Sequence, residues 1–409
     1  MKKTIKIRLR HLTKKQYRHL KELCNASKNL YNQALYTVRQ EYQETEKYLS
    51  YNALDKIMKT LPNLEGNINY KLMKAGVSQQ ILRRLDKSYK SFFQLQKAGY
   101  KESRPPKYLK SKYHNLIFDN QRFQIKDGKA VLDKVVSITI PNQAIDKRIV
   151  QVEIIPQFHA FYACFVYEDD IEYLQIEENE NVMGIDLGLN NLASCATSQG
   201  DFFLINGRPL KSINHYYNKQ KADIQSELEK RNHSKQSVKL QNLTDKRNNK
   251  INDYLHKSSR MIVNQCLDND ISKIVIGEAA KSMSGINLGK RNNQNFINIP
   301  LGRFIDMITY KAGIHGIKTI VINESYTSKA SFIDNDVLPK GYEPDKKHTF
   351  SGKRVKRGLY RTAKGILLNA DINGALNIIR KVVPNFNFHR LIDGIEGRFT
   401  PHCKLLTCQ

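Results

Sequence analysis

The sequence predicts a multidomain α+β protein, and changes in patterning along the chain support this fold class. Residues 13–103 carry apolar side chains at helical spacing, whereas residues 104–175 contain short alternating apolar runs that are typical of strands. After a polar, acidic segment at residues 172–181, apolar strands alternate with helical stretches, as in an α/β layer. A chain of 409 residues is long enough for two or three domains with sizeable cores.

The charge of the chain indicates a polyanionic partner. Lys and Arg number 67 against 39 Asp and Glu, which gives a formal net charge of +28. An excess of that size along the whole chain favours nucleic acid over a long contact surface. No apolar run approaches the roughly 18 residues of a spanning helix, so we expect no membrane partner. The 6 Cys form no CxxC pair, which favours a reducing, cytoplasmic compartment.

The N-terminal third combines a cationic strand with basic helices. Residues 4–10 alternate strictly between an apolar face and a cationic one, which consists of Lys6, Arg8 and Arg10. A capping box at Thr13 and Gln16 starts a helix. A second long helix is expected over residues 75–98, with a cationic face of Arg83, Lys87 and Lys90. One basic stripe is usually a solvated surface, but its repetition on several elements favours phosphate contacts.

Strands are expected from the segment 104–108, where the helical pattern ends, up to the acidic boundary. Asp127-Gly128 is a favoured turn dipeptide and predicts a hairpin. Further strands are predicted over residues 135–140, 152–155 and 161–167. We expect the cationic first strand to join this sheet, with the helical segment inserted between them.

A lone carboxylate, Asp186, follows the apolar residues Val182, Met183 and Ile185. A charge in an apolar strand is costly to bury unless it is paired or holds a metal. Two further short strands follow after tight turns, so the stretch predicts the opening meander of an RNase H-like nuclease core. The alternative on this stretch alone is an Asp that caps a turn in an ordinary sheet.

The second half of the chain contains two more carboxylates in notable positions. A polar helical stretch over about 212–268 leads to the apolar strand 274–278, which ends in Glu278. The polar loop 281–299 is too long for a bare connection, so we expect it to be functional or mobile. A helix over 301–314 and a strand over 318–322 follow. A closing helix over 369–379 then places Asp371 on the same side as Ala375 and Ile378.

In an RNase H-like layout, Asp186, Glu278 and Asp371 converge at one edge of the sheet. Clustered carboxylates repel one another, and divalent cations are the usual remedy. Two Mg²⁺ ions about 4 Å apart would activate a water molecule and stabilise the leaving 3′ oxygen of a phosphodiester. This chemistry needs oxygen ligands and no cysteine.

These motifs together resemble the TnpB family, transposon-encoded RNA-guided DNA endonucleases related to compact type V CRISPR effectors. Residues 184–193, 274–278 and 369–375 are similar to its first, second and third RuvC motifs. Residues 326–329 match a segment that precedes the family's zinc module, and residues 82–93 and 104–108 resemble its N-terminal half. The resemblance covers nearly the whole chain, and three ordered acidic motifs are more specific than any one of them.

The resemblance implies a domain organisation. It places a β-barrel wedge domain at 1–12 and 104–175, a helical recognition domain at 13–103, a RuvC RNase H-like nuclease domain at 176–325 and 369–409, and a target nucleic-acid-binding insert at 326–368. It also implies binding of a transposon-derived guide RNA and cleavage of double-stranded DNA beside a short motif, with both strands cut at a single site. The expected protein is a monomer within a ribonucleoprotein in the prokaryotic cytoplasm, associated with the nucleoid when it acts.

By the same resemblance, Asp186, Glu278 and Asp371 are the catalytic and metal-binding residues, with two Mg²⁺ ions as cofactors and Mn²⁺ as a substitute. The expected nucleic-acid-binding residues are Lys6, Arg8, Arg10, Arg83, Lys87, Lys90, Lys107, Tyr108, Lys329, Lys353, Arg354, Lys356 and Arg357. Because guide pairing supplies sequence specificity, the protein needs mainly positive charge directed at the nucleic-acid backbone.

The chain departs from the family at the insert. The family commonly carries two CxxC pairs that bind Zn²⁺, but no cysteine lies between Cys266 and Cys403 here. His348 is the only histidine of the segment 326–368, and one ligand does not make a zinc site. We therefore predict a zinc-free insert that is held by apolar packing.

Two alternative functions remain open from the sequence. One is a catalytically silent RNA-guided DNA-binding repressor, although a silent protein has no need of three costly carboxylates. The other is a transposase that joins DNA strands, because the RNase H fold serves both reactions. Glu324 is a candidate fourth acid, although a simple strand-end residue is the favoured interpretation. His256 and Lys257 are candidates to line the site, although a helix-surface role is favoured for both. The tail 384–409 receives no role.

Overall fold

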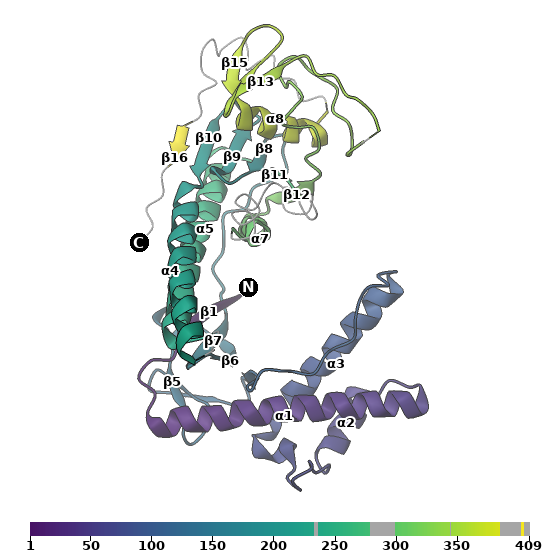
Figure 1. Cartoon of the computed structure of the whole chain (residues 1–409), viewed down its shortest axis with the longest axis vertical. Coiled ribbons are helices and arrows are strands. Elements are labelled where there is room, and N and C mark those ends of the chain that lie inside the picture. The colour runs from purple at the N-terminus through teal and green to yellow at the C-terminus, as the bar shows by residue number, and fades with distance from the viewer. Residues whose placement is uncertain (233–235, 279–298, 344, 385–401, 405–409) are drawn as a thin grey trace. The chain divides into compact units, whose positions relative to one another are not determined.

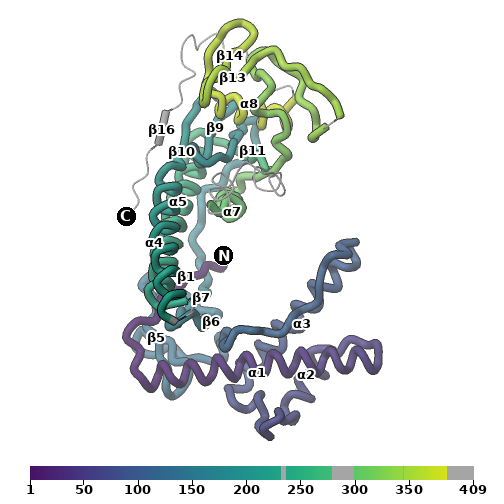
Figure 2. The backbone as a smooth tube through the Cα atoms, viewed as in Figure 1, coloured from purple at the N-terminus to yellow at the C-terminus, as the bar shows by residue number. Residues whose placement is uncertain are grey.

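The computed structural model describes residues 1–232, 236–278, 299–343, 345–384 and 402–404. The chain divides into two compact units, Met1–Ile171 and Glu172–Gln409 (Figures 1 and 2). Each unit combines helices with sheets, which confirms the expected mixture of α and β structure. No helix in the described ranges is both long enough and apolar enough to cross a membrane.

The first unit contains a four-stranded antiparallel sheet in the order β1-β7-β6-β2. Its strands are β1 (Lys2–Arg8), β2 (Leu116–Asp119), β6 (Ile149–Gln157) and β7 (Ala160–Glu168). In the β1–β7 pair Lys6 lies opposite Cys164, so the N-terminal strand joins the later sheet as predicted. A smaller sheet holds β3 (Gln124–Lys126), β4 (Lys129–Val131) and β5 (Ser137–Thr139). Asp127 and Gly128 both have positive φ between β3 and β4, which confirms the predicted turn.

Three helices complete this unit: α1 (Lys14–Thr45), α2 (Tyr51–Met58) and α3 (Ala75–Lys97). Short 3₁₀ turns lie at Asn69–Leu72 and Asn142–Ala144. Thr13 and Gln16 form both hydrogen bonds of the capping box, so the predicted start of α1 is confirmed. The helices and the larger sheet share one apolar core, which includes Leu30, Leu82 and Phe165.

The second unit is organised around a six-stranded sheet in the order β12-β11-β8-β9-β10-β16. Its strands are β8 (Val182–Leu187), β9 (Asn191–Thr197), β10 (Phe202–Asn206), β11 (Lys273–Gly277), β12 (Lys318–Ile322) and β16 (His402–Lys404). The first three form the predicted antiparallel meander. β11 lies parallel to both β8 and β12, and β16 pairs in parallel with β10. Part of the tail therefore forms an edge strand of this sheet.

Four helices of the second unit have defined bounds: α4 (Arg208–Asn232), α5 (Val238–Asp268), α7 (Leu301–Gly313) and α8 (Ala370–Val382). The predicted helical stretch over about 212–268 is formed by two helices, α4 and α5. Ser237 is the N-cap of α5 and accepts a hydrogen bond from the amide of Leu240. The predicted helix over 301–314 and the closing helix are confirmed as α7 and α8. The predicted loop 281–299 lies almost entirely outside the described residues.

The two faces of the sheet carry different helices. Met183 and Ile185 of β8 belong to one apolar core with Tyr254 of α5 and Phe304 of α7. Val182 belongs instead to a cluster with Ile378 of α8. Because side chains alternate along a strand, the even-numbered positions of β8, including Asp186, face α8. A Cβ added to Gly184 would lie 2.2 Å from the backbone oxygen of Ala375, so α8 crosses β8 at a position where only glycine fits.

The segment between β12 and α8 forms a small three-stranded antiparallel sheet and a series of turns. Its strands are β13 (Lys353–Lys356), β14 (Leu359–Arg361) and β15 (Leu367–Asn369). Phe332 and Tyr360 are buried with residues of β9, β10 and α8, as expected for apolar packing. Carboxylates also hold the turns. Asp334 accepts hydrogen bonds from Ser331 Oγ at 2.6 Å and from the amide of Ala363 at 2.8 Å.

Candidate active site

Asp186 lies next to the last residue of β8, on the face covered by α8. A Cβ added to Gly374 of α8 would stand only 2.6 Å from Asp186 Oδ2. A glycine in the first turns of α8 therefore makes the space that the Asp186 carboxylate fills. The interpretation of Asp186 as a simple turn cap is not supported, because Asp186 and its partner Ser194 both lie within paired strands.

Asp371 lies in the first turn of α8, and both of its carboxylate oxygens have partners. The helix begins at Asn369, whose side chain accepts from the amides of Asp371 and Ile372. Asn191 Nδ2 donates to Asp371 Oδ2 at 2.9 Å, and Arg354 donates to Asp371 Oδ1 at 3.1 Å. The Asp371 side chain is 30% exposed, so it is accessible at the surface of the site. Asn191 was not singled out by the sequence, although it belongs to the first acidic motif.

Glu278 directly follows β11, because the strand ends at Gly277 and not at the predicted carboxylate. Its backbone amide donates to the carbonyl oxygen of Ile322 at 2.8 Å, which carries the β11–β12 pairing one residue further. Asp186 and Glu278 therefore lie at the carboxyl ends of neighbouring parallel strands. The backbone places Glu278 at the expected edge of the sheet.

Glu324 lies two residues beyond the end of β12 and was interpreted from the sequence as a strand-end residue. In the structure, a Cβ added to Gly277 would stand 2.9 Å from Glu324 Oε2, so the carboxylate packs against the end of β11. No local sequence pattern could place Glu324 there, because only the pairing of β11 with β12 brings Glu324 beside Gly277.

The electrostatics of the site are those of crowded carboxylates. The pKa of Asp186 is raised well above its ordinary value by burial, then by Glu324 and Asp371, while Arg354 opposes the shift. Burial also raises the pKa of Glu324, and Lys381 opposes that shift. Each neighbouring negative charge disfavours ionisation of Asp186, and a cation among them would relieve the repulsion.

Carboxylate oxygens are the donors that a hard divalent cation such as Mg²⁺ prefers. Glu324 and Asp371 both raise the pKa of Asp186, and two glycines leave room for the carboxylates of Asp186 and Glu324 on the α8 side of the sheet. Within the described ranges, however, no three His, Cys, Asp or Glu side chains are close enough together to hold a metal ion. Arg354 and Asn191 engage the Asp371 carboxylate that such an ion would need.

Each of the predicted nucleic-acid-binding residues is exposed. They occur on or just after β1, on α3, after α3, in the turns that follow β12, and on or just after β13. Several stack on aromatic rings: Lys6 lies 4.6 Å from the Tyr162 ring centroid, and Tyr108 is stacked by the guanidinium of Arg39 at 4.8 Å. Two of them pair with carboxylates: Lys90 with Asp86 at 2.8 Å and Arg354 with Asp371 at 3.1 Å.

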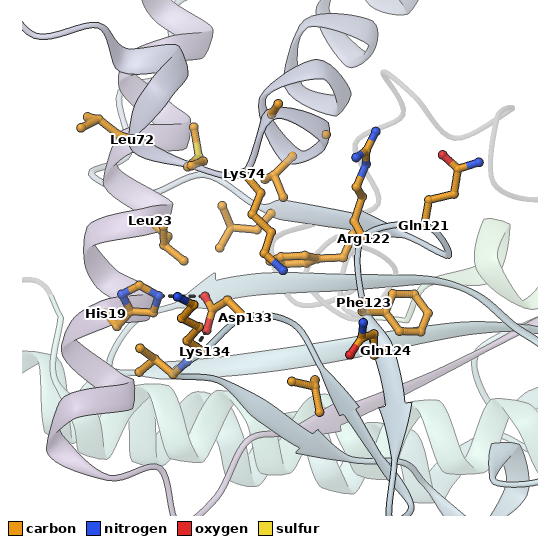
Figure 3. Close-up of a pocket in the computed structure, with 18 residues that line it drawn as sticks. His19, Leu23, Leu72, Lys74, Gln121, Arg122, Phe123, Gln124, Asp133 and Lys134 are labelled. Carbon is orange, nitrogen blue, oxygen red and sulfur yellow. Dashed lines mark hydrogen bonds and ion pairs between the residues drawn. The ribbon is translucent and has the colours of Figure 1, made fainter.

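The first unit contains an open cavity of about 830 Å³ that the sequence did not reveal (Figure 3). Its polar lining includes His19, Lys74, Gln121, Arg122, Gln124, Asp133 and Lys134. His19 and Asp133 interact at 2.8 Å, and Lys74 Nζ donates to the Leu132 carbonyl at 2.6 Å. Apolar residues, among them Leu23 and Phe123, line the rest. The lining comes from segments far apart in the sequence, which explains why no local pattern indicated it.

Comparison with known proteins connects this architecture to a family. Residues 163–283 match a family model described as a probable transposase, OrfB_IS605, and residues 302–378 match a Cas12f1-like TNB domain. The TnpB-like protein ORF457 of Acidianus two-tailed virus is 27% identical over 215 residues, which are 50% of this chain and 43% of that protein. These matches make the chain similar to the TnpB family.

The two family matches cover the structural elements of the site. The first includes β8 with Asp186 and β11 with Glu278, and the second runs from α7 through the insert to α8 with Asp371. The matched region of this chain spans less than half the length of the curated relative. A solved Cas12f1–sgRNA–target DNA complex shares the fold with a TM-score of 0.54 at 15% identity, covering 88% of this chain and 81% of that one.

Proposed function

We propose that this protein is an RNA-guided DNA endonuclease of the TnpB type. The observation that carries the proposal is the acidic centre at the carboxyl end of β8, where Asp186 packs against Gly374 of α8 and where burial, Glu324 and Asp371 raise its pKa. Similarity to the TnpB family and the fold shared with a guide RNA–target DNA complex support it. An RNase H-like core is supported by the meander β8-β9-β10, which continues into the parallel strands β11 and β12.

In the proposed reaction, Asp186, Glu278 and Asp371 hold divalent cations, and the bound metal would activate water and stabilise the leaving oxygen. The chain's own residues set the geometry of these ligands. Asn191 fixes one oxygen of Asp371, and the Asn369 cap fixes the start of the helix that carries it. Arg354 has to leave Asp371 before that carboxylate can turn fully toward a cation.

The proposal assigns sequence recognition to a guide RNA and backbone contact to the protein. The net charge of +28 and the exposed cations on both units suit phosphate contacts. The division into wedge, recognition, nuclease and insert domains, with the predicted bounds, belongs to the same proposal. So does a monomeric ribonucleoprotein that acts on chromosomal or plasmid DNA in the cytoplasm.

The decisive experiment has two steps. The protein is purified from cells that carry its native locus, and bound RNA is sequenced. The resulting complex is then incubated with a plasmid that matches the RNA, with Mg²⁺ or with EDTA. We expect a defined copurifying RNA and cleavage in Mg²⁺ only. Bound RNA without cleavage would favour the silent repressor, and strand joining would favour the transposase.

The insert should contribute backbone contacts rather than sequence recognition. Replacing Lys353, Lys356 and Arg357 with Gln is expected to weaken DNA binding to a similar degree on all guide-matched targets, because exposed cations on β13 contact phosphates. The slope of log affinity against log salt should become shallower by about 0.9 for each contact removed. Filter binding at several salt concentrations measures both effects. A loss confined to some target sequences would contradict this assignment.

We also assign nucleic-acid contact to the cavity of the first unit. Its amides, Gln121 and Gln124, suit base edges, whereas Arg122 and Lys134 suit phosphates. Gln121→Ala is therefore expected to relax the preference for bases beside the target, measured by cleavage of a plasmid library randomised there. Gln94→Ala, an exposed amide on α3, is the control. If Gln121→Ala leaves the preference for bases beside the target unchanged, the assignment of base contact to this cavity is wrong.

A further inference from the structure

We infer that the insert binds unpaired nucleotides by stacking a base on Tyr342. The inference deepens the proposed function, on which it rests for its choice of partner, because it names the form of nucleic acid that this surface takes. It comes from four aromatic side chains in the turns between β12 and β13, none of which the acidic site uses. This aromatic group consists of Tyr326, Tyr342, His348 and Phe350.

Tyr326 is the centre of the aromatic group, and contacts fix both its ring and its backbone. The ring centroid lies 4.8 Å from that of His348 and 6.0 Å from that of Phe350. The Tyr326 hydroxyl donates to the carbonyl oxygen of Glu343 at 3.1 Å and accepts from the Glu343 amide at 3.3 Å. The φ angle of Tyr326 is +67°, a left-handed conformation that is costly for a residue with a side chain. Such a conformation persists only where the surroundings impose it, and it is concentrated at binding and active sites.

Tyr342 differs from the rest of the aromatic group because it is held in place without being buried. Its ring stacks on Tyr326, with 6.2 Å between the centroids and 22° between the planes. The backbone next to it is fixed, because both polar groups of the Glu343 peptide bond the Tyr326 hydroxyl. Yet Tyr342 is 73% exposed, whereas the other three aromatic residues are half-buried. Tyr342 therefore contributes little to the packing of the insert and leaves ring surface open to a ligand.

Cations surround Tyr342, which favours nucleic acid over an apolar peptide. Exposed lysines flank it along the chain: Lys340, Lys346 and Lys347. The neighbouring acid Glu343 is paired with Lys346 at 3.2 Å. Across the whole insert 326–368, Lys and Arg outnumber Asp and Glu. A proline-rich peptide also suits an aromatic surface, but it gains nothing from these charges, whereas phosphates do.

The aromatic group also lies close to the cations of β13. Phe350 precedes the start of β13 at Lys353 by three residues, and three residues of extended chain span at most about 11 Å. All four residues of β13 are exposed. Proteins that bind single strands combine an aromatic ring for a base with a row of cations for the backbone. A duplex cannot use the ring in this way, because its bases are already stacked on one another.

The test is Tyr342→Ala in the full-length chain, compared with Tyr342→Phe and Tyr342→Leu. A labelled oligothymidylate and a duplex of the same length are titrated in EDTA, and binding is measured by fluorescence anisotropy. We expect Tyr342→Ala to lower single-strand affinity by about fivefold or more, as for loss of one base-stacking ring, and to leave duplex affinity unchanged. Tyr342→Phe keeps the ring and should bind as wild type, whereas Tyr342→Leu should bind as weakly as Tyr342→Ala. Tyr216→Ala, at a tyrosine of α4 that is 61% exposed, is the control and should change nothing.

The salt dependence of binding separates stacking from charge. Stacking releases no counterions, so Tyr342→Ala should keep the wild-type slope of log affinity against log salt. The Gln substitutions in and after β13 should instead make that slope shallower. Wild-type affinity in Tyr342→Ala, equal losses on single strand and duplex, or a change of slope would each overturn the inference.

A fluorescent variant reports on the same surface with the ring retained. The chain contains no tryptophan, so Tyr342→Trp places a single indole at this position. The oligothymidylate should quench its fluorescence and the duplex should not. Val337→Trp, at an 87% exposed position of the same insert, is the control and should respond to neither. Quenching of Tyr342→Trp by a proline-rich peptide and not by the oligothymidylate would assign the surface to a protein partner and overturn the inference.

Failure of this inference and failure of the proposed function give different results. Binding in EDTA requires no cleavage. A chain without nuclease activity that still loses single-strand affinity on Tyr342→Ala would contradict the proposed function and retain the stacking site. A guide RNA complex that cuts DNA in Mg²⁺, while Tyr342→Ala binds single strands as wild type does, would contradict only the stacking site.

Discussion

Asp186→Ala is expected to abolish DNA cleavage while leaving guide RNA and target DNA binding close to wild type. The residue lies at the centre of the acidic site, where Glu324 and Asp371 act on it and Gly374 makes room for its carboxylate. Nucleic-acid binding depends on exposed cations elsewhere, so it should persist. Plasmid cleavage and a mobility-shift assay on the same preparation measure the two activities.

A second substitution of the same residue, Asp186→Asn, carries a prediction for stability. The pKa of Asp186 is raised in the folded chain, so its ionised form is favoured more in the unfolded chain. This group therefore costs stability as the pH rises above its ordinary pKa, and the cost persists at neutral pH. In metal-free buffer at pH 7, Asp186→Asn should melt no lower than wild type, and the difference should shrink as the pH falls toward 4. Asp201→Asn, an exposed aspartate in the β9–β10 turn, is the control.

For the cleavage prediction, DNA cutting that persists in Asp186→Ala would contradict the assignment of Asp186 to the active site.

Asp336→Ala is expected to destabilise the insert by about 3 kcal/mol, because charge-assisted hydrogen bonds contribute about 1.5–3 kcal/mol each and these are partly solvated. The Asp336 carboxylate accepts from the amide of Ser331 at 2.7 Å and from the hydroxyl of Ser351 at 2.5 Å. Its backbone oxygen accepts from Arg380 of α8. Urea unfolding followed by proteolysis within 326–368 locates and measures the loss.

The matched control for this prediction is Asp345→Ala, an exposed carboxylate of the same insert. EDTA should leave the melting of the insert unchanged, since the hydrogen bonds of Asp334 and Asp336 connect the turns in this chain. Equal effects of Asp336→Ala and Asp345→Ala would show that these bonds do not hold the insert. A strong effect of EDTA on the insert would show that the zinc-free prediction is wrong.

Features with a local signal could be predicted from the sequence. The alternation of residues 4–10 predicted β1, the capping box at Thr13 predicted the start of α1, and Asp127-Gly128 predicted the hairpin turn. Each of these depends on neighbours within a few residues, where backbone geometry dictates the side-chain pattern. Asp186 was found for the same reason, as a charge that interrupts an apolar strand.

The features that the sequence did not reveal depend on contacts between distant segments. Glu324 gains its position from the register of β11 and β12, and Asn191 from the approach of α8 to β9. The hydrogen bonds of Asp334 to residues 331 and 363 close only when the turns of the insert are folded. Apolar packing was predicted for the insert, but no periodic sequence pattern predicts carboxylates whose hydrogen bonds connect turns.

Helix α8 has a mechanical consequence for the protein. Asn373 donates to the Ala330 carbonyl at 2.8 Å, and Asn377 donates to the carbonyls of Thr327 and Ala330. The same helix begins with Asp371 and packs its Gly374 against Asp186. The insert, Asp371 and Asp186 thus all contact one helix. A displacement of the insert would therefore reach the site through α8 and would not need to pass through the sheet.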